Sequence, residues 1–487
     1  MLSEVNVSTH LRQQKKREIL LLQKLAFCAL GILATICTMD PQATPGYRFQ
    51  FLLPLSYSIA HFIFAPPFDG LGIGYQMLNI IWIIRYVLGP ALIRLSRYEL
   101  RHFYVGVSDS HLNIALVLML GELWFTFFSC YFFYNRYKTR IAKESSGSRD
   151  QLKNVNPRTV FALVLLSAVI IIFDRNVLSG YNFIFRDTFM RRAEGVTFGT
   201  LVMIVSWCKT IVTIFLIGKF GERDLVKPSK FNVLCALFIT ILSMSFFNGT
   251  TRSGLLIEGL AFVYLLVSFF PRYKKRILAV GFGGIFLLIL SITLFRFYQT
   301  RVLSQAYEIF SVNSLAHLLN AYFAGQQNVA IGVKTLALYG SEYEVLTVLK
   351  DFLANTVLLN KLVSNIPGTV QLYNFTFYGH TWWADQIAPT ITQALGLFSF
   401  FGMFVPVILV WLVIKLDVFA LNTNSVLEVF VGSFTAATLS FFMPGNLTII
   451  ATSINNYFIP LFMISKMSRL KLVFGNTGNY RINDVSS

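Results

Sequence analysis

The amino-acid sequence predicts an all-α polytopic membrane protein with about twelve transmembrane helices, each needing about 20 mostly apolar residues. The chain of 487 residues is 55% hydrophobic and only 13% charged, with a mean hydropathy of +0.62. A soluble domain carries about 25% charged residues, so a soluble enzyme is excluded. The net charge of +18 is explained by cytoplasmic lysines and arginines that orient the spans. It does not indicate a nucleic-acid partner.

Apolar runs close to spanning length recur along the chain. They are residues 20–38, 47–65, 72–93, 111–134, 159–174, 197–218, 231–247, 255–270, 277–295, 393–414, 425–443 and 447–465. The pair at 47–93 also fits a re-entrant hairpin, because Pro66, Pro67 and Gly70 interrupt it. The first run lacks a small-residue cleavage site, so we expect it to remain as the first span.

Lysine and arginine mark the predicted orientation of these spans. Basic residues gather near the N-terminus, at 135–158, 219–230 and 271–276, and in the C-terminal tail. Twelve alternating spans place every one of these segments on the cytoplasmic side, as the positive-inside rule requires. The prediction is therefore a multi-pass membrane protein with both termini in the cytoplasm. It divides into an N-terminal bundle of about nine spans, a large outside loop, about three C-terminal spans and a tail. These parts are residues 1–295, 296–392, 393–465 and 466–487.

The outside loop, residues 296–392, is the one long stretch that no membrane span explains; we call it the long segment. Loops longer than roughly 15 residues are usually functional or disordered, and this one is too apolar and aromatic to be disordered. It contains a polar GQQN turn (residues 325–328) and ends in FYGHTWWADQIAPT (residues 377–390). We expect the long segment to be partly helical and to fold over a site in the membrane domain.

Other outside loops, and the first residues of the long segment, contain arginines but no lysine. The predicted anion-binding residues are Arg175, Arg186, Arg191, Arg192, Arg252 and Arg301. Arginine makes planar, bidentate contacts to phosphate and carboxylate, so the set indicates a mouth that binds a pyrophosphate or an acidic sugar. The alternative is structural: pairing with Asp174, Asp187 and Glu194, or contact with lipid headgroups.

Ionisable residues inside the predicted spans are candidate site residues, because charge in a membrane is costly. They are Arg85, Glu122, Lys209, Glu258 and Glu428. Glu258 lies about two helical turns after Arg252 and can face the same cavity. The alternative is that these residues form structural ion pairs, Lys209 with Glu258 among them.

The end of the long segment supplies further candidates, His380 and Asp385, among Tyr378, Trp382 and Trp383. Aromatic rings stack on sugars, and a histidine or carboxylate can take a proton from a hydroxyl. An interfacial aromatic belt explains the tryptophans equally well. The five cysteines lie in apolar runs without metal or disulfide spacing, and no nucleotide-binding or hydrolase motif occurs. We therefore expect no metal and no other cofactor.

Three stretches carry a resemblance to a known family. They are FRDTFMRR (residues 185–192), NGTTRSGLLIEG (residues 248–259) and IAPTITQALGLFSFFG (residues 387–402). Together with the order of spans and loops, they resemble the Wzy-type polymerases that join oligosaccharide repeat units in bacterial O-antigen and capsule synthesis. The resemblance covers most of the chain as architecture.

The resemblance implies a membrane glycosyltransferase acting on the outer face of a bacterial inner membrane. It would move a growing glycan from undecaprenyl pyrophosphate to the non-reducing end of a new lipid-linked repeat unit. Arg252, Arg186, Arg191 and Arg192 would bind pyrophosphate or glycan. We expect His380 to be the base, with Asp385 or Glu258 as alternatives. The implied partners are the lipid-linked oligosaccharides, membrane lipid, a chain-length regulator and a flippase.

Two other functions fit this architecture. An O-antigen ligase would share the arginine mouth and the large loop but use a different acceptor. A flippase for lipid-linked oligosaccharides is the non-enzymatic alternative; transporters usually show two related halves, and the sequence shows no internal repeat.

Overall fold

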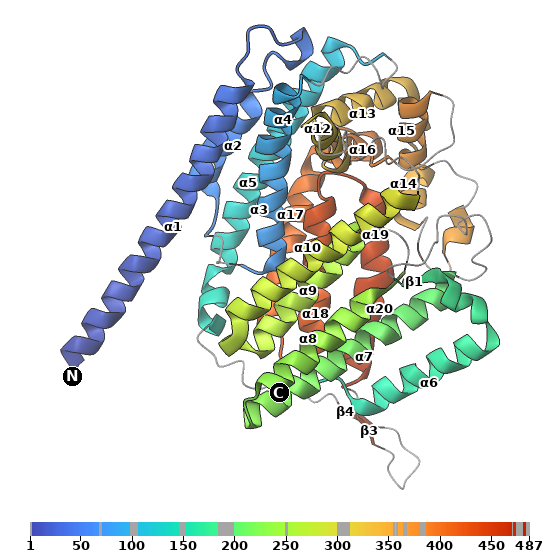
Figure 1. Cartoon of the computed structure of the whole chain (residues 1–487). Helices are drawn as coiled ribbons and strands as arrows, with labels where there is room; N and C mark the ends of the chain where they lie inside the picture. The colour runs from blue at the N-terminus through green and yellow to red at the C-terminus, as the bar shows by residue number, and fades with distance from the viewer. Residues whose placement is uncertain are drawn as a thin grey trace.

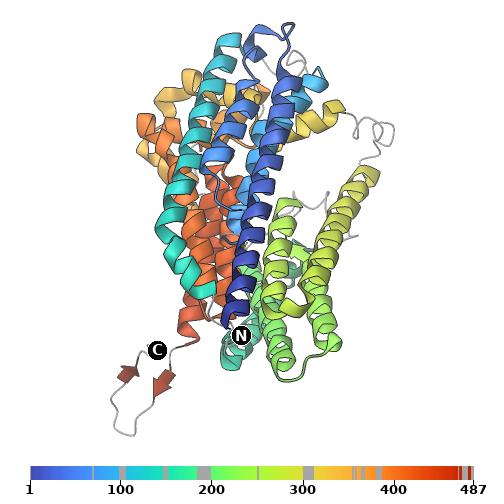
Figure 2. The same ribbon diagram turned by 90° about the vertical axis from the view of Figure 1, so that its left-hand side faces the viewer.

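The protein is almost entirely helical (Figure 1). The computed structural model describes residues 2–67, 71–97, 106–145, 152–183, 199–248, 252–299, 312–353, 356, 359–363, 368–379, 386–469, 471–473 and 481–483. Helix α1 (Leu2–Thr38) begins and α20 (Ile459–Met467) ends at the same end of the molecule (Figure 2). We call this the proximal end and the opposite one the distal end.

The N-terminal part of the bundle contains α1 and four further helices. They are α2 (Leu52–Phe64), α3 (Ile73–Ile83), α4 (Gly89–Leu95) and α5 (Asp109–Ser145). α1 packs along α2, and α2 packs on α5. A π-helical turn, η3 (Ile84–Leu88), continues α3 into α4. Such turns inside helices are frequent at functional sites, and this one contains Arg85.

The middle of the chain forms α6 (Pro157–Phe173), α7 (Gly199–Val226), α8 (Lys230–Ser245), α9 (Arg252–Phe269) and α10 (Lys274–Gln299). The starts of α6 and α8 follow from their sequences. The side chains of Asn156 and Ser229 accept backbone N–H groups of the first turns, which are the donors a helix leaves unpaired. α7 packs on α8, and α9 packs on α10.

A sharp bend separates α9 from α10. The chain turns by 114° between Ser253–Phe269 and Pro271–Leu287. Proline has no N–H to continue the hydrogen-bond ladder and its ring clashes with the preceding turn, so Pro271 ends α9. The two helices consequently lie against each other instead of forming one long rod.

The C-terminal helices occupy the centre of the bundle (Figure 1). They are α17 (Val405–Asn422), α18 (Val426–Phe442), α19 (Leu447–Ser453) and α20. Every residue of α18 except Phe434 is buried. α18 contacts α3, α9 and α17. A helix that is apolar and buried on all sides belongs to the core of a large bundle, so α18 is the central helix of the fold.

The long segment lies at the distal end as a set of short helices (Figures 1 and 2). They are α12 (Val312–Tyr322), α13 (Gln326–Tyr339), α14 (Val345–Leu353), α15 (Thr369–Tyr378) and α16 (Thr390–Phe398). α12 packs on α4, α13 on α5, and α14 on α19. The long segment is thus packed on the bundle over several of its helices.

The shorter helical turns of the chain are η1 (Pro45–Tyr47), η5 (Arg175–Gly180), η7 (Pro271–Tyr273), η9 (Gly340–Glu342), η10 (Asn360–Val363), η11 (Ser399–Phe404) and η12 (Ile454–Phe458).

Several helices are long and apolar enough to cross a membrane, so this is a multi-pass membrane protein. Within the described residues there are six such helices, or up to seven if the bent pair α9 and α10 is one span. The six are Glu18–Thr38, Ile73–Leu95, Asp109–Thr139, Thr200–Val226, Thr390–Asn422 and Leu447–Met467. Three shorter apolar helices, α6, α8 and α18, accompany them. Each of the predicted runs contains helix, but helix length alone does not establish twelve spans, and that number stays a prediction.

Residues 47–93 combine a short helix with a helix of spanning length. α2 has 13 residues and is therefore about 20 Å long, whereas the hydrocarbon core is roughly 30 Å thick. Pro66 and Pro67 follow its end directly. The next helical stretch, Ile73–Leu95, is long enough to cross, so the re-entrant hairpin and the two spans both stay predictions.

Large apolar side chains on the outside of the bundle agree with a lipid environment. Val117, Phe161 and Ile172 are 66%, 70% and 73% exposed. A soluble protein rarely exposes contiguous apolar surface of this kind.

Two short antiparallel strand pairs depart from the predicted all-α fold. β1 (Tyr181–Phe183) pairs with β2 (Phe246–Asn248), and β3 (Lys471–Val473) pairs with β4 (Arg481–Asn483). The register of the first pair sets Tyr181 opposite Asn248 and Phe183 opposite Phe246. This pair joins two loops that are far apart in the sequence.

Candidate functional site

The pairing of β1 with β2 brings the two arginine-bearing loops together. Arg175 begins η5, directly before β1, and is exposed. Arg252 is the first residue of α9, shortly after β2. The strand pair sets the backbone of the two loops side by side; that both arginines line one mouth stays a prediction. Arg186, Arg191, Arg192 and Arg301 lie outside the described residues.

An ion pair lies beside this strand pair. Lys209 Nζ on α7 is 3.4 Å from Glu258 Oε1 on α9. The same amine donates to the carbonyls of Ser243 at 3.2 Å and of Phe246, the first residue of β2, at 2.8 Å. The two charged side chains are 18% and 19% exposed. Glu258 is therefore engaged by a cation from another helix, as the structural alternative predicted.

A second π-helical turn, η12, connects this region to the long segment. The indole Nε1 of Trp207 on α7 donates to the carbonyl of Asn456 at 2.8 Å. Asn455 Nδ2 donates to the carbonyl of Phe352 and to Thr356 Oγ1, both at 2.9 Å. A π-helical turn widens the spacing of its side chains and is frequent at functional sites. Here it lets one helix hold both α7 and the end of α14.

A buried carboxylate, Asp351, organises the interior of the long segment. Its side chain is 3% exposed and accepts the backbone N–H of Thr369 at 3.1 Å, and also the Thr369 hydroxyl. Gln393 Nε2 donates to Thr369 Oγ1 at 2.6 Å, and Gln393 Oε1 accepts the N–H of Leu447 at 2.9 Å. This chain of contacts links α14, α15, α16 and α19.

Burial raises the pKa of the Asp351 carboxyl to about 6, because the charged form loses its hydration, although the two Thr369 hydrogen bonds oppose that shift. Nothing in the sequence marks Asp351 as a site residue. An aspartate on a short amphipathic helix is usually part of a solvated face. The partner of Asp351, Thr369, lies on the separate helix α15. Asp351 caps α15 from a different helix, which is a structural role.

The two residues predicted to act as the base, His380 and Asp385, lie outside the described residues, but the structure describes the chain on both sides of them. α15 ends at Gly379, which has a φ of +85° that suits glycine. The side chain of Asn374 accepts the N–H of Gln386 at 2.9 Å and donates to its carbonyl at 3.2 Å. One side chain of α15 therefore fixes the point at which the chain returns from the predicted catalytic residues.

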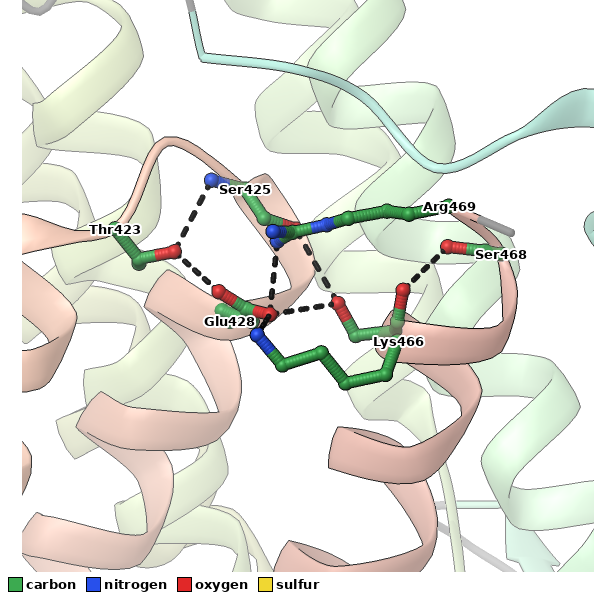
Figure 3. A network of polar contacts seen from close by, with 7 residues as sticks. Thr423, Ser425, Glu428, Lys466, Ser468 and Arg469 are labelled. Carbon is green, nitrogen blue, oxygen red and sulfur yellow. Dashed lines mark hydrogen bonds and ion pairs between the residues drawn. The ribbon is translucent and has the colours of Figure 1, made fainter. Parts of the chain in front are cut away.

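The remaining in-span charges are also paired. Arg85 Nη2 is 2.6 Å from Glu122 Oε2, with both side chains fully buried. At the proximal end, Glu428 Oε1 is 3.2 Å from Lys466 Nζ and 2.8 Å from Arg469 Nη2 (Figure 3). Each of the five in-span residues thus has an oppositely charged partner within 4 Å.

Metal binding finds no support in the described ranges, where no group of three or more histidine, cysteine, aspartate and glutamate side chains could hold an ion. Comparison of the chain with known protein families, with curated proteins and with solved structures finds no match. The function is therefore argued from the residues and their arrangement.

Proposed function

We propose that the protein polymerises lipid-linked oligosaccharide repeat units on the outer face of a bacterial inner membrane. The observation that carries the proposal is the β1–β2 pair, which sets the strand that follows Arg175 and η5 beside the strand that ends at Asn248, four residues before Arg252. These loops contain arginines and no lysine. Arginine forks suit a pyrophosphate group, which is the leaving group of an undecaprenyl pyrophosphate donor.

The chemistry requires charge stabilisation and one proton acceptor. In the transfer, the bond between the sugar anomeric carbon and the phosphate oxygen breaks, and undecaprenyl pyrophosphate leaves with the electron pair. The acceptor hydroxyl oxygen bonds to the anomeric carbon and its proton passes to a base. The departing diphosphate would be stabilised by Arg252, Arg186, Arg191 and Arg192. His380 is our choice for the base, with Asp385 and then Glu258 as alternatives.

The experiment that tests the function is the length of surface glycan in a deletion strain, read from a gel of extracted polysaccharide. Loss of the ladder with one capped repeat unit remaining supports a polymerase. Loss of all surface glycan, with full polymer still on its lipid carrier, would mean an O-antigen ligase. Repeat units trapped on the inner face would mean a flippase.

Complementation of that strain tests the arginine mouth. Arg252→Ala should abolish long polymer while single repeat units still reach the surface. The matched control is Arg272→Ala, which removes an exposed arginine from the turn between α9 and α10 at residues 271–273; we expect it to restore the ladder. Full-length polymer from a well-expressed Arg252→Ala protein would remove Arg252 from the site.

Topology is tested separately. Ser341 is exposed on η9 in the long segment, and the proposed function requires this segment to face outward. A membrane-impermeant thiol reagent should label a Ser341→Cys protein in intact cells; each native cysteine is replaced by serine in the parent. Labelling only after cell lysis would reverse the orientation and exclude the proposal.

A further inference from the structure

Arg85 makes hydrogen bonds in addition to its buried ion pair with Glu122. Arg85 is 2% exposed and Glu122 is fully buried, and the pair uses one guanidinium nitrogen, Nη2. The other nitrogen, Nη1, donates to the carbonyls of Phe323 at 3.3 Å and of Pro444 at 3.1 Å. Arg85 lies in η3, so three distant parts of the chain meet at one guanidinium.

Both carbonyls belong to the junctions of the long segment with the bundle. Phe323 directly follows α12, the first described helix of that segment. The carbonyl of Pro444 also accepts the N–H of Thr390 at 3.0 Å, and Asn446 N–H donates to the carbonyl of Ala388 at 2.8 Å. The chain that returns from residues 380–385 is therefore attached to the α18–α19 turn at the point that Arg85 holds.

The GQQN motif, at the start of α13, also contributes to this junction. Its glutamine Gln326 is 1% exposed, and its Nε2 donates at 3.0 Å both to the carbonyl of Gly46 and to that of Leu112 on α5. Gln326 and Arg85 line one small cavity, with room for about one water molecule. The motif that stood out in the sequence thus docks the start of α13 on the bundle.

We propose that Arg85, held by Glu122, is a positioning residue: it fixes residues 386–390, where the long segment returns to the membrane bundle. An effect of Arg85 on catalysis rests on the proposed function, since His380 and Asp385 immediately precede these residues. The geometry requires arginine. Only a planar guanidinium presents donors at fixed angles to a carboxylate and to two carbonyls at once, while a lysine ammonium is a single compact centre.

Backbone carbonyls inside a membrane protein explain why this contact matters. Irregular chain at membrane depth is tolerated only where its polar groups are satisfied by protein or water. The carbonyls of Phe323 and Pro444 lie at helix ends, where a helix leaves its last carbonyls unpaired. Without Arg85, the carbonyl of Phe323 loses this donor and that of Pro444 keeps only the N–H of Thr390.

Amide hydrogen exchange on the full-length protein in detergent tests the proposal independently of activity. In Arg85→Lys, the amides of Thr390 and Asn446 should exchange at least about 10-fold faster, as expected when a charged hydrogen bond is lost. The amides of Lys153 and Val426, which bond across the proximal end, should be unchanged. If Arg85→Lys does not fold, the double variant Arg85→Met/Glu122→Met, which leaves no unpaired charge, takes its place. Unchanged exchange at Thr390 and Asn446, or a uniform rise at all four amides, would overturn the proposal.

Turnover provides the second measurement. With lipid-linked repeat units as substrate, the same variant should lose at least about 10-fold in kcat while KM stays within about two-fold, because positioning affects only interactions made in the transition state. An unchanged kcat with accelerated exchange would remove the catalytic consequence. Accelerated exchange in a protein whose wild type makes no polymer would overturn the proposed function and leave Arg85 as the anchor of the long segment.

Discussion

The two ends of the bundle are held by ion pairs in opposite environments. At the distal end, Arg85 and Glu122 are fully buried, and Arg85 also holds two backbone carbonyls. At the proximal end, the partners of Glu428 are half exposed, Lys466 at 52% and Arg469 at 45% (Figure 3). Both clusters join segments distant in sequence, yet only in the distal one are both partners of the ion pair buried.

The difference shows how burial sets the cost of losing a partner. A half-exposed ammonium or guanidinium can be solvated again when its carboxylate is removed, so such pairs contribute about 0–1 kcal/mol. A buried charge that loses its partner cannot be solvated, and the loss costs about 3–5 kcal/mol. The distal end should therefore respond to single substitutions far more strongly than the proximal end.

The largest effect is expected for Arg85→Met. The substitution leaves the Glu122 carboxylate buried and unpaired, and we expect the free energy of unfolding to fall by about 3–5 kcal/mol. Adding Glu122→Met removes the isolated charge and should restore most of that loss, because two apolar side chains replace a buried pair at little cost. Denaturant unfolding of the purified protein in detergent measures both variants.

The same measurement can show that the buried and half-exposed ion pairs do not differ in their effect on stability. If Arg85→Met lowers the free energy of unfolding by less than about 1 kcal/mol, the distal pair behaves like a surface pair. A double variant no more stable than the single one would show that the two carbonyl contacts, and not the isolated carboxylate, dominate the loss.

A smaller, pH-dependent effect is expected at Asp351. Its folded pKa is raised to about 6 from 3.8, so the folded state binds the proton more tightly than the unfolded chain. The resulting stability is fully present below about pH 4 and is lost as the pH rises through about 6. The two-unit difference corresponds to at most about 3 kcal/mol. Lowering the pH from 8 to 5 should therefore stabilise the α14–α15 contact, as measured by the protection factor of the Thr369 amide, from which the intrinsic pH dependence of exchange is divided out.

Two variants isolate that carboxyl from other titrating groups. Asp351→Asn keeps an acceptor for the N–H of Thr369 and should abolish the pH dependence of its protection factor. Glu342→Gln removes an exposed carboxylate from the same segment and should leave the dependence in place. An equal pH dependence in wild type and Asp351→Asn would mean that another group is responsible.

The parts of the fold that the sequence predicts depend on local physics. Apolar runs report the transfer of a segment into hydrocarbon, and Pro271 ends a helix wherever its neighbours lie, so helices and the α9–α10 break follow directly. Exact span lengths do not follow, because short helices such as α2 are stabilised by packing on α1 and α5. Residues 47–93 show this, since the short α2 lies next to Ile73–Leu95, which has spanning length.

The candidate site is less predictable because its partners come from distant chain. The sequence marks Arg85 and Glu122 as costly charges but contains no sign that Arg85 also bonds Phe323 and Pro444. Asp351 gives no signal, because its role depends on Thr369, on another helix. The β1–β2 pair was likewise unforeseen, as strands this short have no recognisable alternation.

The smallest effect is expected for Lys466→Ala at the proximal end. Glu428 keeps Arg469 at 2.8 Å and also accepts the hydroxyl of Thr423, so its carboxylate remains paired. The lost ammonium is 52% exposed, and we expect the free energy of unfolding to fall by no more than about 1 kcal/mol. Arg469→Ala is the matched control, since it removes the closer cation and leaves Lys466. A loss of about 3 kcal/mol or more from Lys466→Ala alone would place this carboxylate with the buried pairs. The contrast between the two ends would then depend on the 3% exposure of Glu428 instead of on the exposure of its partners.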